Sequence, residues 1–474
     1  MSKWLVLTIL NFYKHAMFKA YPAKFIDMAS QYVDIVYRYQ LPILNVSDVE
    51  NLTLNYTMRE LKPEIAGEEK KSNILFVVTK PYENGGHTKL MANLADMVEG
   101  DKDLLVSRVC KEAALQRLKP YFSNIEKVSR SLNESSLDFI SRLVGSMHGY
   151  KKIVLNTSPS DIYSILACGY LSRLDKGVKI YFVNHADHAC SFGATIADYW
   201  FEISLYGKDL DRIRGVRGKS SFLGIPLKII RGEESGCLLK EYPNINDINI
   251  FLTAGSPHKF LPYNKSSILP LLKEVLSLNP RFTVKIIGPK LKTNLWLWMF
   301  YFKYKRRVSI VQSLPYADYI HVVNSADYYI DSSPIPGGTA FAEQFLSGRA
   351  CTGLKTGYYG YSPLEKFKFY DIQQVISFIK CPPSVSALLE MNKQIIEVHD
   401  YSSVRSRFIQ CLDEGVVSSN PMLDYYAELK TDIDVPVRYL RILFSRRFII
   451  FKVLFEAFGV WLAFFSAKSN FRQN

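Results

Sequence analysis

The residues with the clearest chemical potential lie at 331–348, where Asp331 is followed by the stretch SSPIPGGTAFAEQFLSG. An apolar run ends here in a loop with two prolines and two glycines, and an amphipathic helix is predicted to follow at once. The free N–H groups and the dipole of a helix N-terminus favour an anion, and Gly337 and Gly338 would let that anion reach the backbone. Thr339 is expected to cap the helix and to contact a phosphate through its hydroxyl. Glu343, one turn later, would accept a hydrogen bond from a ribose hydroxyl. The same residues also suit a plain strand-to-helix turn with a surface glutamate, and spacing alone does not separate the two interpretations.

A second group of reactive side chains is His185, Asp187 and His188 in the stretch VNHADHACSFG. The group directly follows an apolar strand, which places it at the edge of a sheet. Histidine titrates near neutrality, so one of these residues could act as a general base that deprotonates a hydroxyl group. A metal site and a hydrogen-bonded turn are the alternatives. A metal site would need more ligands, and no further His, Asp or Glu set at ligand spacing accompanies the cluster.

Strands and helices alternate along most of the chain, as in a parallel sheet that is covered by helices. The first series begins with NILFVVT (73–79) and the second with INIFLTAG (248–255), and a polar stretch at 228–247 separates them. Each opening strand ends in a small-residue loop, which in the first series contains Gly85 and Gly86. The fold class predicted from this pattern is α/β, with two Rossmann-like doubly wound domains. The expected organisation is a helical N-terminal extension (1–70), an N-terminal domain (71–230), a linker (231–247), a C-terminal domain (248–400) and C-terminal helices (401–474).

The composition indicates a chain with an anionic partner. It has 474 residues, of which 48% are hydrophobic, and a formal net charge of +14. Such a surplus of Lys and Arg favours a nucleic acid, an acidic lipid surface or a phosphorylated small molecule. The seven cysteines are scattered and odd in number, which indicates reduced thiols in a cytoplasmic protein. The basic and apolar N-terminus is interpreted as a membrane-touching or packed helix in preference to a signal peptide.

Two aromatic or apolar segments raise the question of a membrane. Residues 448–465 form an apolar stretch with only Lys452 and Glu456 as charges, and several arginines precede it. A helix lying in the membrane surface is the preferred interpretation, and a packed helix and a membrane span are the alternatives. Residues 291–307 combine six aromatic residues with four basic ones near the end. Core packing with a basic lip near a membrane is favoured there over binding of single-stranded nucleic acid.

The C-terminal motifs resemble those of GT-B glycosyltransferases, in the style of O-GlcNAc transferase and the bacterial adhesin glucosyltransferases. The resemblance rests on residues 314–353, which contain an apolar strand, Asp331, the Pro/Gly-Gly-Thr turn PIPGGT, the acidic helix AFAEQF and then SGRACTG. It implies that Lys259, in the loop after the first strand of the second domain, grips the donor diphosphate. GGHTKL (85–90) is similar to the glycine-rich first loop of many GT-B enzymes, which implies a donor contact for Gly85 and Gly86. A functional histidine or acid after a strand of the first domain is also common in them, and His185 is the preferred candidate.

The resemblance implies two domains facing a cleft, with the acceptor on the first and a nucleotide-sugar donor on the second. The expected activity is transfer of a hexose to a glycan or lipid-linked acceptor in cell-surface polysaccharide synthesis. The protein would act on the cytoplasmic face of an anionic membrane as a peripheral enzyme. No metal is expected, because no Asp-x-Asp pair follows an apolar strand. No nucleic acid is expected, because no RNA-binding signature accompanies the aromatic segment 291–307, and no other cofactor is expected. Two alternatives remain: a nucleotide-sugar epimerase of the same architecture, and a non-enzymatic membrane- or nucleic-acid-binding protein.

Overall fold

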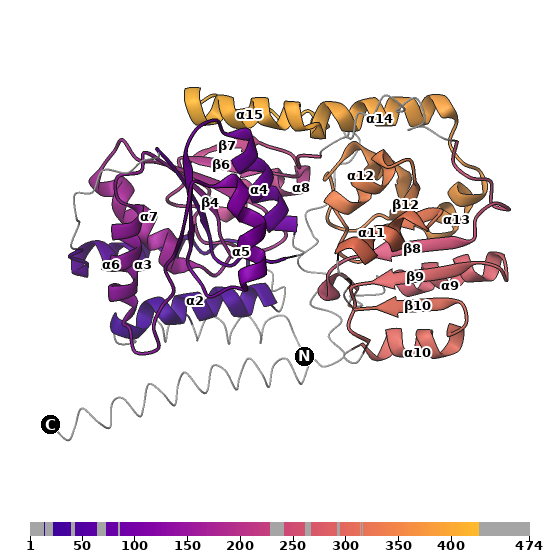
Figure 1. Ribbon diagram of the computed structural model, residues 1–474, viewed down its shortest axis with the longest axis horizontal. Coiled ribbons are helices and arrows are strands. Elements are labelled where there is room, and N and C mark those ends of the chain that lie inside the picture. The colour runs from indigo at the N-terminus through magenta and orange to yellow at the C-terminus, as the bar shows by residue number, and fades with distance from the viewer. Residues whose placement is uncertain are drawn as a thin grey trace, which may run out of the picture.

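The protein contains two parallel β-sheets, each covered by helices on both faces (Figure 1). This is the doubly wound α/β architecture predicted from the alternation of strands and helices. The computed structural model describes residues 14, 22–38, 43–63, 73–83, 86–227, 241–260, 267–291, 294–312, 314 and 316–425.

The N-terminal sheet has seven parallel strands in the order β3-β2-β1-β4-β5-β6-β7. Their apolar runs are continuous because helices cover both faces, so that Phe76 and Val77 of β1 are both buried although they point in opposite directions. The strands are β1 (Ile74–Val78), β2 (Lys102–Val106), β3 (Asn124–Lys127), β4 (Lys152–Asn156), β5 (Lys179–Asn184), β6 (Tyr199–Glu202) and β7 (Lys219–Phe222).

Seven α-helices of the described chain surround this sheet: α2 (Pro22–Arg38), α3 (Ser47–Glu60), α4 (Gly86–Met97), α5 (Glu112–Leu118), α6 (Ser136–Met147), α7 (Ile162–Leu174) and α8 (Leu205–Arg214). The helices α2 and α3 pack against α6 and α7. Ile26, Val33 and Leu54 lie in one buried apolar cluster with Ile140 and Leu166. The described part of the N-terminal extension therefore belongs to the helical layer of the first domain.

The C-terminal sheet has six parallel strands in the order β10-β9-β8-β11-β12-β13. In both sheets the strand order reverses beside the first strand, between β1 and β4 and between β8 and β11, and such switch points are where ligands bind. The strands are β8 (Ile250–Ala254), β9 (Thr283–Ile287), β10 (Val308–Val311), β11 (Tyr328–Ile330), β12 (Ala350–Leu354) and β13 (Lys368–Phe369). The helices are α9 (Ile268–Leu278), α10 (Leu295–Tyr304), α11 (Tyr316–Asn324), α12 (Thr339–Leu346) and α13 (Ile372–Lys380).

Two consecutive helices, α14 (Val385–His399) and α15 (Tyr401–Glu414), run along one side of both domains (Figure 1). The chain returns through them to the first domain, where the rings of Phe408 and Phe201 meet with centroids 5.5 Å apart. The hydroxyl of Tyr401 donates to Asp96 of α4 at 2.7 Å. A short helix, α16 (Met422–Tyr425), follows. The described residues contain no helix that is long and apolar enough to cross a bilayer, and the stretch 448–465 lies outside them.

The aromatic helix α10 corrects one prediction. We expected its aromatic residues to pack in the core, but of the residues in this helix only Leu297 and Phe300 are buried. Trp298 is 45% exposed and Phe302 is 52% exposed. The reason lies in the topology, because α10 precedes β10, the edge strand of its sheet, and no described element covers the outer side of the helix.

Candidate active site

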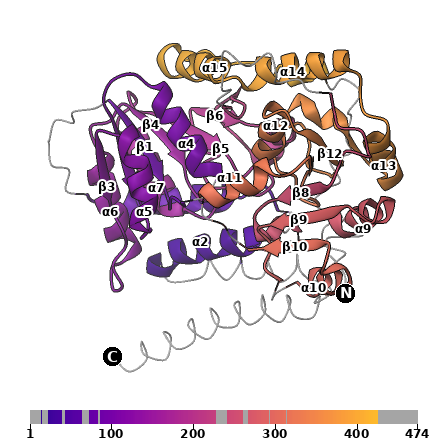
Figure 2. The ribbon, with the colours of Figure 1, turned by 45° about the vertical axis from the view of Figure 1, so that its right-hand side comes forward.

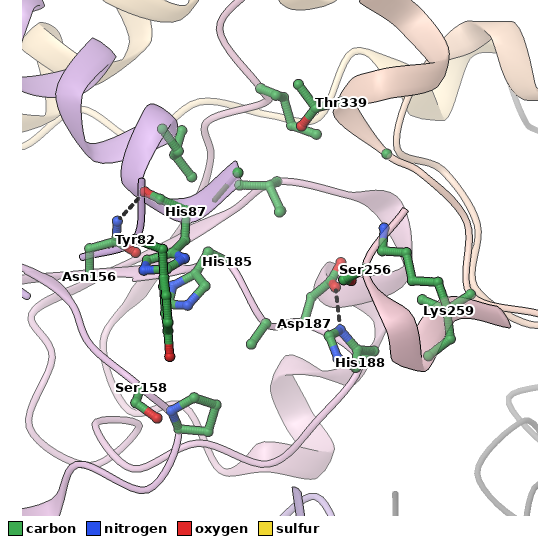
Figure 3. A pocket seen from close by; sticks show the side chains of 18 of the residues that line it. Tyr82, His87, Asn156, Ser158, His185, Asp187, His188, Ser256, Lys259 and Thr339 are labelled. Carbon is green, nitrogen blue, oxygen red and sulfur yellow. Dashed lines mark hydrogen bonds and ion pairs between the residues drawn. The ribbon is translucent and has the colours of Figure 1, made fainter. Parts of the chain in front are cut away.

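A pocket of about 400 Å³ lies between the two domains (Figure 3). Its N-terminal side is lined by residues that follow β1, β4 and β5, and its C-terminal side by residues that follow β8 and β11. Both sheets thus present their carboxyl edges, where open α/β sheets bind ligands. The predicted site residues that line it are Gly86, His185, Asp187, His188, Lys259, Gly337, Gly338 and Thr339. Gly85 lies outside the described residues, and Glu343 does not line the pocket.

Asp331, which directly follows β11, shapes the glycine loop that leads to α12. Its Oδ1 accepts hydrogen bonds from the backbone N–H groups of Ser332 and Gly337, each at 2.8 Å. A Cβ atom at Gly337 would overlap that oxygen. Gly338 has φ +31° and ψ −93°, a conformation that favours glycine. The two glycines are therefore required by the loop itself, one for close approach and the other for backbone conformation.

The start of α12 differs from the prediction in one respect, because Thr339 does not cap the helix. Thr339 is its first residue, Gly338 is the N-cap, and no side chain caps the helix. In the described part of the chain the N–H groups of Gly338 and Thr339 have no hydrogen-bond partner, whereas that of Gly337 is used by Asp331. An uncapped N-terminus leaves its donors and its positive dipole end available to an anion. The anion site thus offers two free backbone donors and one hydroxyl.

Lys259 reaches the same loop from η3 (Pro257–Phe260), the short helix after β8. Its Nζ donates to the carbonyl oxygen of Pro336 at 2.6 Å, which uses one of its three N–H donors. Burial lowers the pKa of Lys259, and the carboxylates of Asp331 and Asp187 oppose that shift. Figure 3 shows Lys259 and Thr339 across the pocket from His87 and His185.

A buried ion pair supports the glycine loop from behind. Nζ of Lys368 lies 2.7 Å from Oδ2 of Asp331 and 3.9 Å from Oε1 of Glu365. Burial alone would lower the pKa of Lys368, but the two carboxylates outweigh burial and the pKa is raised. The ammonium also lies 4.4 Å from the ring centre of Phe341 in α12. The carboxylate of Asp331 therefore accepts from the loop backbone through Oδ1 and pairs with the buried ammonium of Lys368 through Oδ2.

Two histidines form the opposite wall (Figure 3). The ring of His185, just after β5, stacks on that of His87 in the first turn of α4, with centroids 5.3 Å apart. Burial, reinforced by His87, lowers the pKa of His185 to about 3. Burial also lowers the pKa of His87. His185 is therefore neutral near pH 7, and our expectation of a histidine that titrates near neutrality is not met at this residue.

Asp187 and His188 are adjacent, with Nδ1 of His188 3.8 Å from Oδ1 of Asp187. Asp187 is 1% exposed, and its carboxylate accepts hydrogen bonds from the hydroxyls of Tyr361, at 2.6 Å, and Ser204. Because Tyr361 belongs to the second domain, Asp187 joins the domains, and its carboxylate lies beside the ring of His188. The buried Nε2 of His188 has no partner among the described residues. Within the described ranges, no group of three or more His, Cys, Asp or Glu residues could hold a metal ion.

Glu343 also spans the two domains. Its carboxylate forms an ion pair with Lys89 of α4, and the side chains are 35% and 46% exposed. Such exposed pairs contribute little to stability. The predicted contact of Glu343 with a ribose hydroxyl stays a prediction.

No protein-family model matches the sequence, and no curated protein matches it. Solved structures do match the fold. HepE of Anabaena in complex with UDP is 12% identical, with a TM-score of 0.54 over 72% of this chain and 100% of HepE. An O-GlcNAc transferase of Thermobaculum terrenum is 12% identical, with a TM-score of 0.51 over 82% of this chain and 76% of that one. The chain has the GT-B fold. The resemblance inferred from the C-terminal motifs is thus confirmed at the level of the fold.

Two polar residues of the GT-B cleft were not predicted from the sequence. His87 follows the glycine pair that was predicted to contact the donor, and Asn156 is the last residue of β4. The Nδ2 of Asn156 donates to the backbone oxygen of His87 at 2.9 Å and so fixes the start of α4. The signal that was available is position, because a polar residue at the end of a buried parallel strand faces the ligand edge of the sheet.

Proposed function

We propose that this chain is a glycosyltransferase of the hexosyltransferase type that uses a nucleotide-sugar donor. The observation that carries the proposal is the meeting of the free N–H groups of Gly338 and Thr339 with the ammonium of Lys259 in one interdomain pocket. These groups fit a diphosphate, which needs several donors and a positive charge at short range. The matched HepE structures, in complex with UDP and with UDP-glucose, agree with such a ligand.

In this mechanism the bond between the anomeric carbon and the leaving phosphate oxygen breaks, and the acceptor oxygen bonds to that carbon. Negative charge grows on the departing diphosphate, where Lys259 and the start of α12 would stabilise it. Donors that are already in place lower the barrier more than tight binding of the donor substrate does. A metal ion is then not required, and we propose a metal-independent reaction.

The acceptor hydroxyl must lose its proton, and we assign that step to His188. Its Nε2 is unpartnered in the described chain, and its other nitrogen faces the carboxylate of Asp187. A carboxylate behind an imidazole stabilises the imidazolium that forms when the proton is taken up. His185, with a pKa of about 3, would be a much weaker base. Its place beside His87 suits a role in binding the sugar or the acceptor.

The acceptor would enter from the side of the first domain. A second cavity of about 610 Å³ lies there and shares Lys80, Tyr82 and Arg108 with the interdomain pocket. We propose a glycan or lipid-linked acceptor in cell-surface polysaccharide synthesis, and action as a peripheral protein on the cytoplasmic face of an anionic membrane. The net charge of +14 and the arginines before 448–465 support the membrane part.

The decisive experiment is calorimetric titration with a panel of nucleoside diphosphates. Charge-assisted hydrogen bonds contribute about 1.5–3 kcal/mol, so Lys259→Ala should weaken the preferred diphosphate by about 10- to 150-fold. Lys273→Ala, at an exposed lysine of α9 in the same domain, is the matched control and should bind like the wild type. The proposal fails if no diphosphate binds, or if Lys259→Ala binds as tightly as the control. Conversion of the donor sugar without any acceptor would favour an epimerase.

A further inference from the structure

The helix α10 carries an apolar stripe on its outer side. Leu295, Trp298, Met299 and Phe302 follow one another at the i, i+3, i+4, i+7 spacing of a single helix face, and they are 65%, 45%, 53% and 52% exposed. Trp296 beside them is 44% exposed. The inner side, with Leu297 and Phe300, is buried against the domain. A helix that is apolar on both sides needs a second apolar environment besides its own domain.

The segment of sequence around this stripe carries charges of one sign. Residues 275–317 contain eight Lys or Arg residues and no Asp or Glu. Some of these cations are structural, since Arg307 donates to the carbonyl oxygens of Leu276, Asn279 and Phe282. Lys305 and Arg306, at the end of the helix, are exposed and form no ion pair with a described residue. The surface therefore combines tryptophans with uncompensated positive charge.

We propose that the outer face of α10 docks on an anionic lipid bilayer. Tryptophan favours the boundary between acyl chains and headgroups, and Lys and Arg bind anionic headgroups. A protein partner would have to offer an apolar groove rimmed by acidic groups, whereas an anionic bilayer offers both properties together. Among the described elements, the helix lies at the lower edge in both views, away from α14 and α15 (Figure 1 and Figure 2).

The docking helix is joined directly to the proposed donor site. The side chain of Asn294 caps α10 by accepting from the N–H of Leu297 at 3.1 Å. The same side chain donates to the carbonyl oxygen of Phe260 at 3.3 Å, and Phe260 follows Lys259 in η3. A bilayer that binds α10 would therefore anchor the second domain through a helix that is hydrogen-bonded to the segment carrying Lys259. The proposed docking does not depend on the proposed sugar transfer. Only the use of this docking for a lipid-linked acceptor rests on that proposed function.

The test is flotation of the full chain with vesicles of phosphatidylcholine alone or with 30% phosphatidylglycerol, a composition chosen for the assay. The wild type should float only with the anionic vesicles. The double substitution Trp298→Ser and Phe302→Ser should lower partitioning at least tenfold, and Lys305→Glu with Arg306→Glu should do the same. Leu389→Ser on α14, which replaces a leucine that is 51% exposed, is the apolar control, and Lys273→Glu is the charge control.

Wild-type flotation of both double variants would overturn the proposal, because another segment would then bind the lipid. A wild-type chain that does not float with the anionic vesicles would also overturn the proposal. Self-association of the wild type that the Trp298→Ser and Phe302→Ser substitutions abolish, in the absence of any flotation, would assign the face to a second copy of the chain. Nucleoside diphosphate titration of the same variants should match the wild type, which separates this test from that of the proposed function.

Discussion

Replacing Asp331 by asparagine should strongly destabilise the C-terminal domain, because Lys368 would lose the carboxylate that lies 2.7 Å from its ammonium. The side chains of the pair are only 4% and 1% exposed. At an effective dielectric constant of about 20, charges at this distance attract each other by about 6 kcal/mol, and the cost of burial offsets part of that. Removal of one partner of a buried pair typically costs about 3–5 kcal/mol, and we expect a loss in this range. Glu365, at 3.9 Å, would be the nearest remaining carboxylate.

Asparagine keeps an oxygen that can accept from Gly337, so the substitution tests the charge more than the shape of the loop. The assay is the free energy of unfolding from denaturant titration, for Asp331→Asn, Lys368→Met and the double variant. The double variant should be more stable than the sum of the two losses predicts, by at least about 2 kcal/mol, since it leaves no unpaired buried charge.

The matched control is the pair of Lys152 and Asp413, which has the same 2.7 Å separation but side chains 28% and 57% exposed. The corresponding neutral substitutions there should cost at most about 1 kcal/mol. Additive losses at Asp331 and Lys368, or a loss at Asp331 no larger than at the control, would refute the reasoning. The ion pair would then not be what supports the glycine loop.

Two further predictions concern the loop and the domain interface. Gly337→Ala should weaken the preferred nucleoside diphosphate at least tenfold in calorimetry, because its Cβ would displace Asp331, whereas Gly145→Ala, where a Cβ meets nothing within 4 Å, should bind normally. Unchanged binding in Gly337→Ala would contradict this role of the loop. Burial and Arg407 lower the pKa of His399 to about 3 from an ordinary 6.5. Between these two pH values the unfolded chain binds more protons than the folded chain. The free energy of unfolding therefore falls as the pH drops below 6.5. By pH 5 the loss should be about 2 kcal/mol of unfolding free energy, measured as the part of the pH dependence that His399→Gln removes. An equal pH dependence in both proteins would refute it.

The two sheets could be predicted because their strands are continuous apolar runs with helices on both faces, a pattern visible without any structure. The position of the glycine loop before α12 followed from the same pattern, since it comes directly after a strand, whereas Lys259 was implied by the resemblance to GT-B enzymes. The hydrogen bond from Gly337 to Asp331 could not be predicted, because it depends on how the loop 331–338 folds back on itself. The exposure of α10 could not be predicted either, because apolar composition does not show which side of a helix packs against a neighbouring element.

One side chain connects the two chemical halves of the cleft. The ring of Tyr361 lies against Gly338, where an added Cβ would be 3.4 Å from its Cδ1, and its hydroxyl donates to Asp187 at 2.6 Å. The proposed anion site at the start of α12 is thereby linked through Tyr361 and Asp187 to His188, the proposed base. Because the groups that would stabilise the leaving group and take up the proton lie on different domains, their distance is set by how the domains meet. Because Tyr361 contacts Gly338 and hydrogen-bonds to Asp187, it sets the distance between the start of α12 and His188 before any substrate binds. Such preorganisation is what electrostatic catalysis requires.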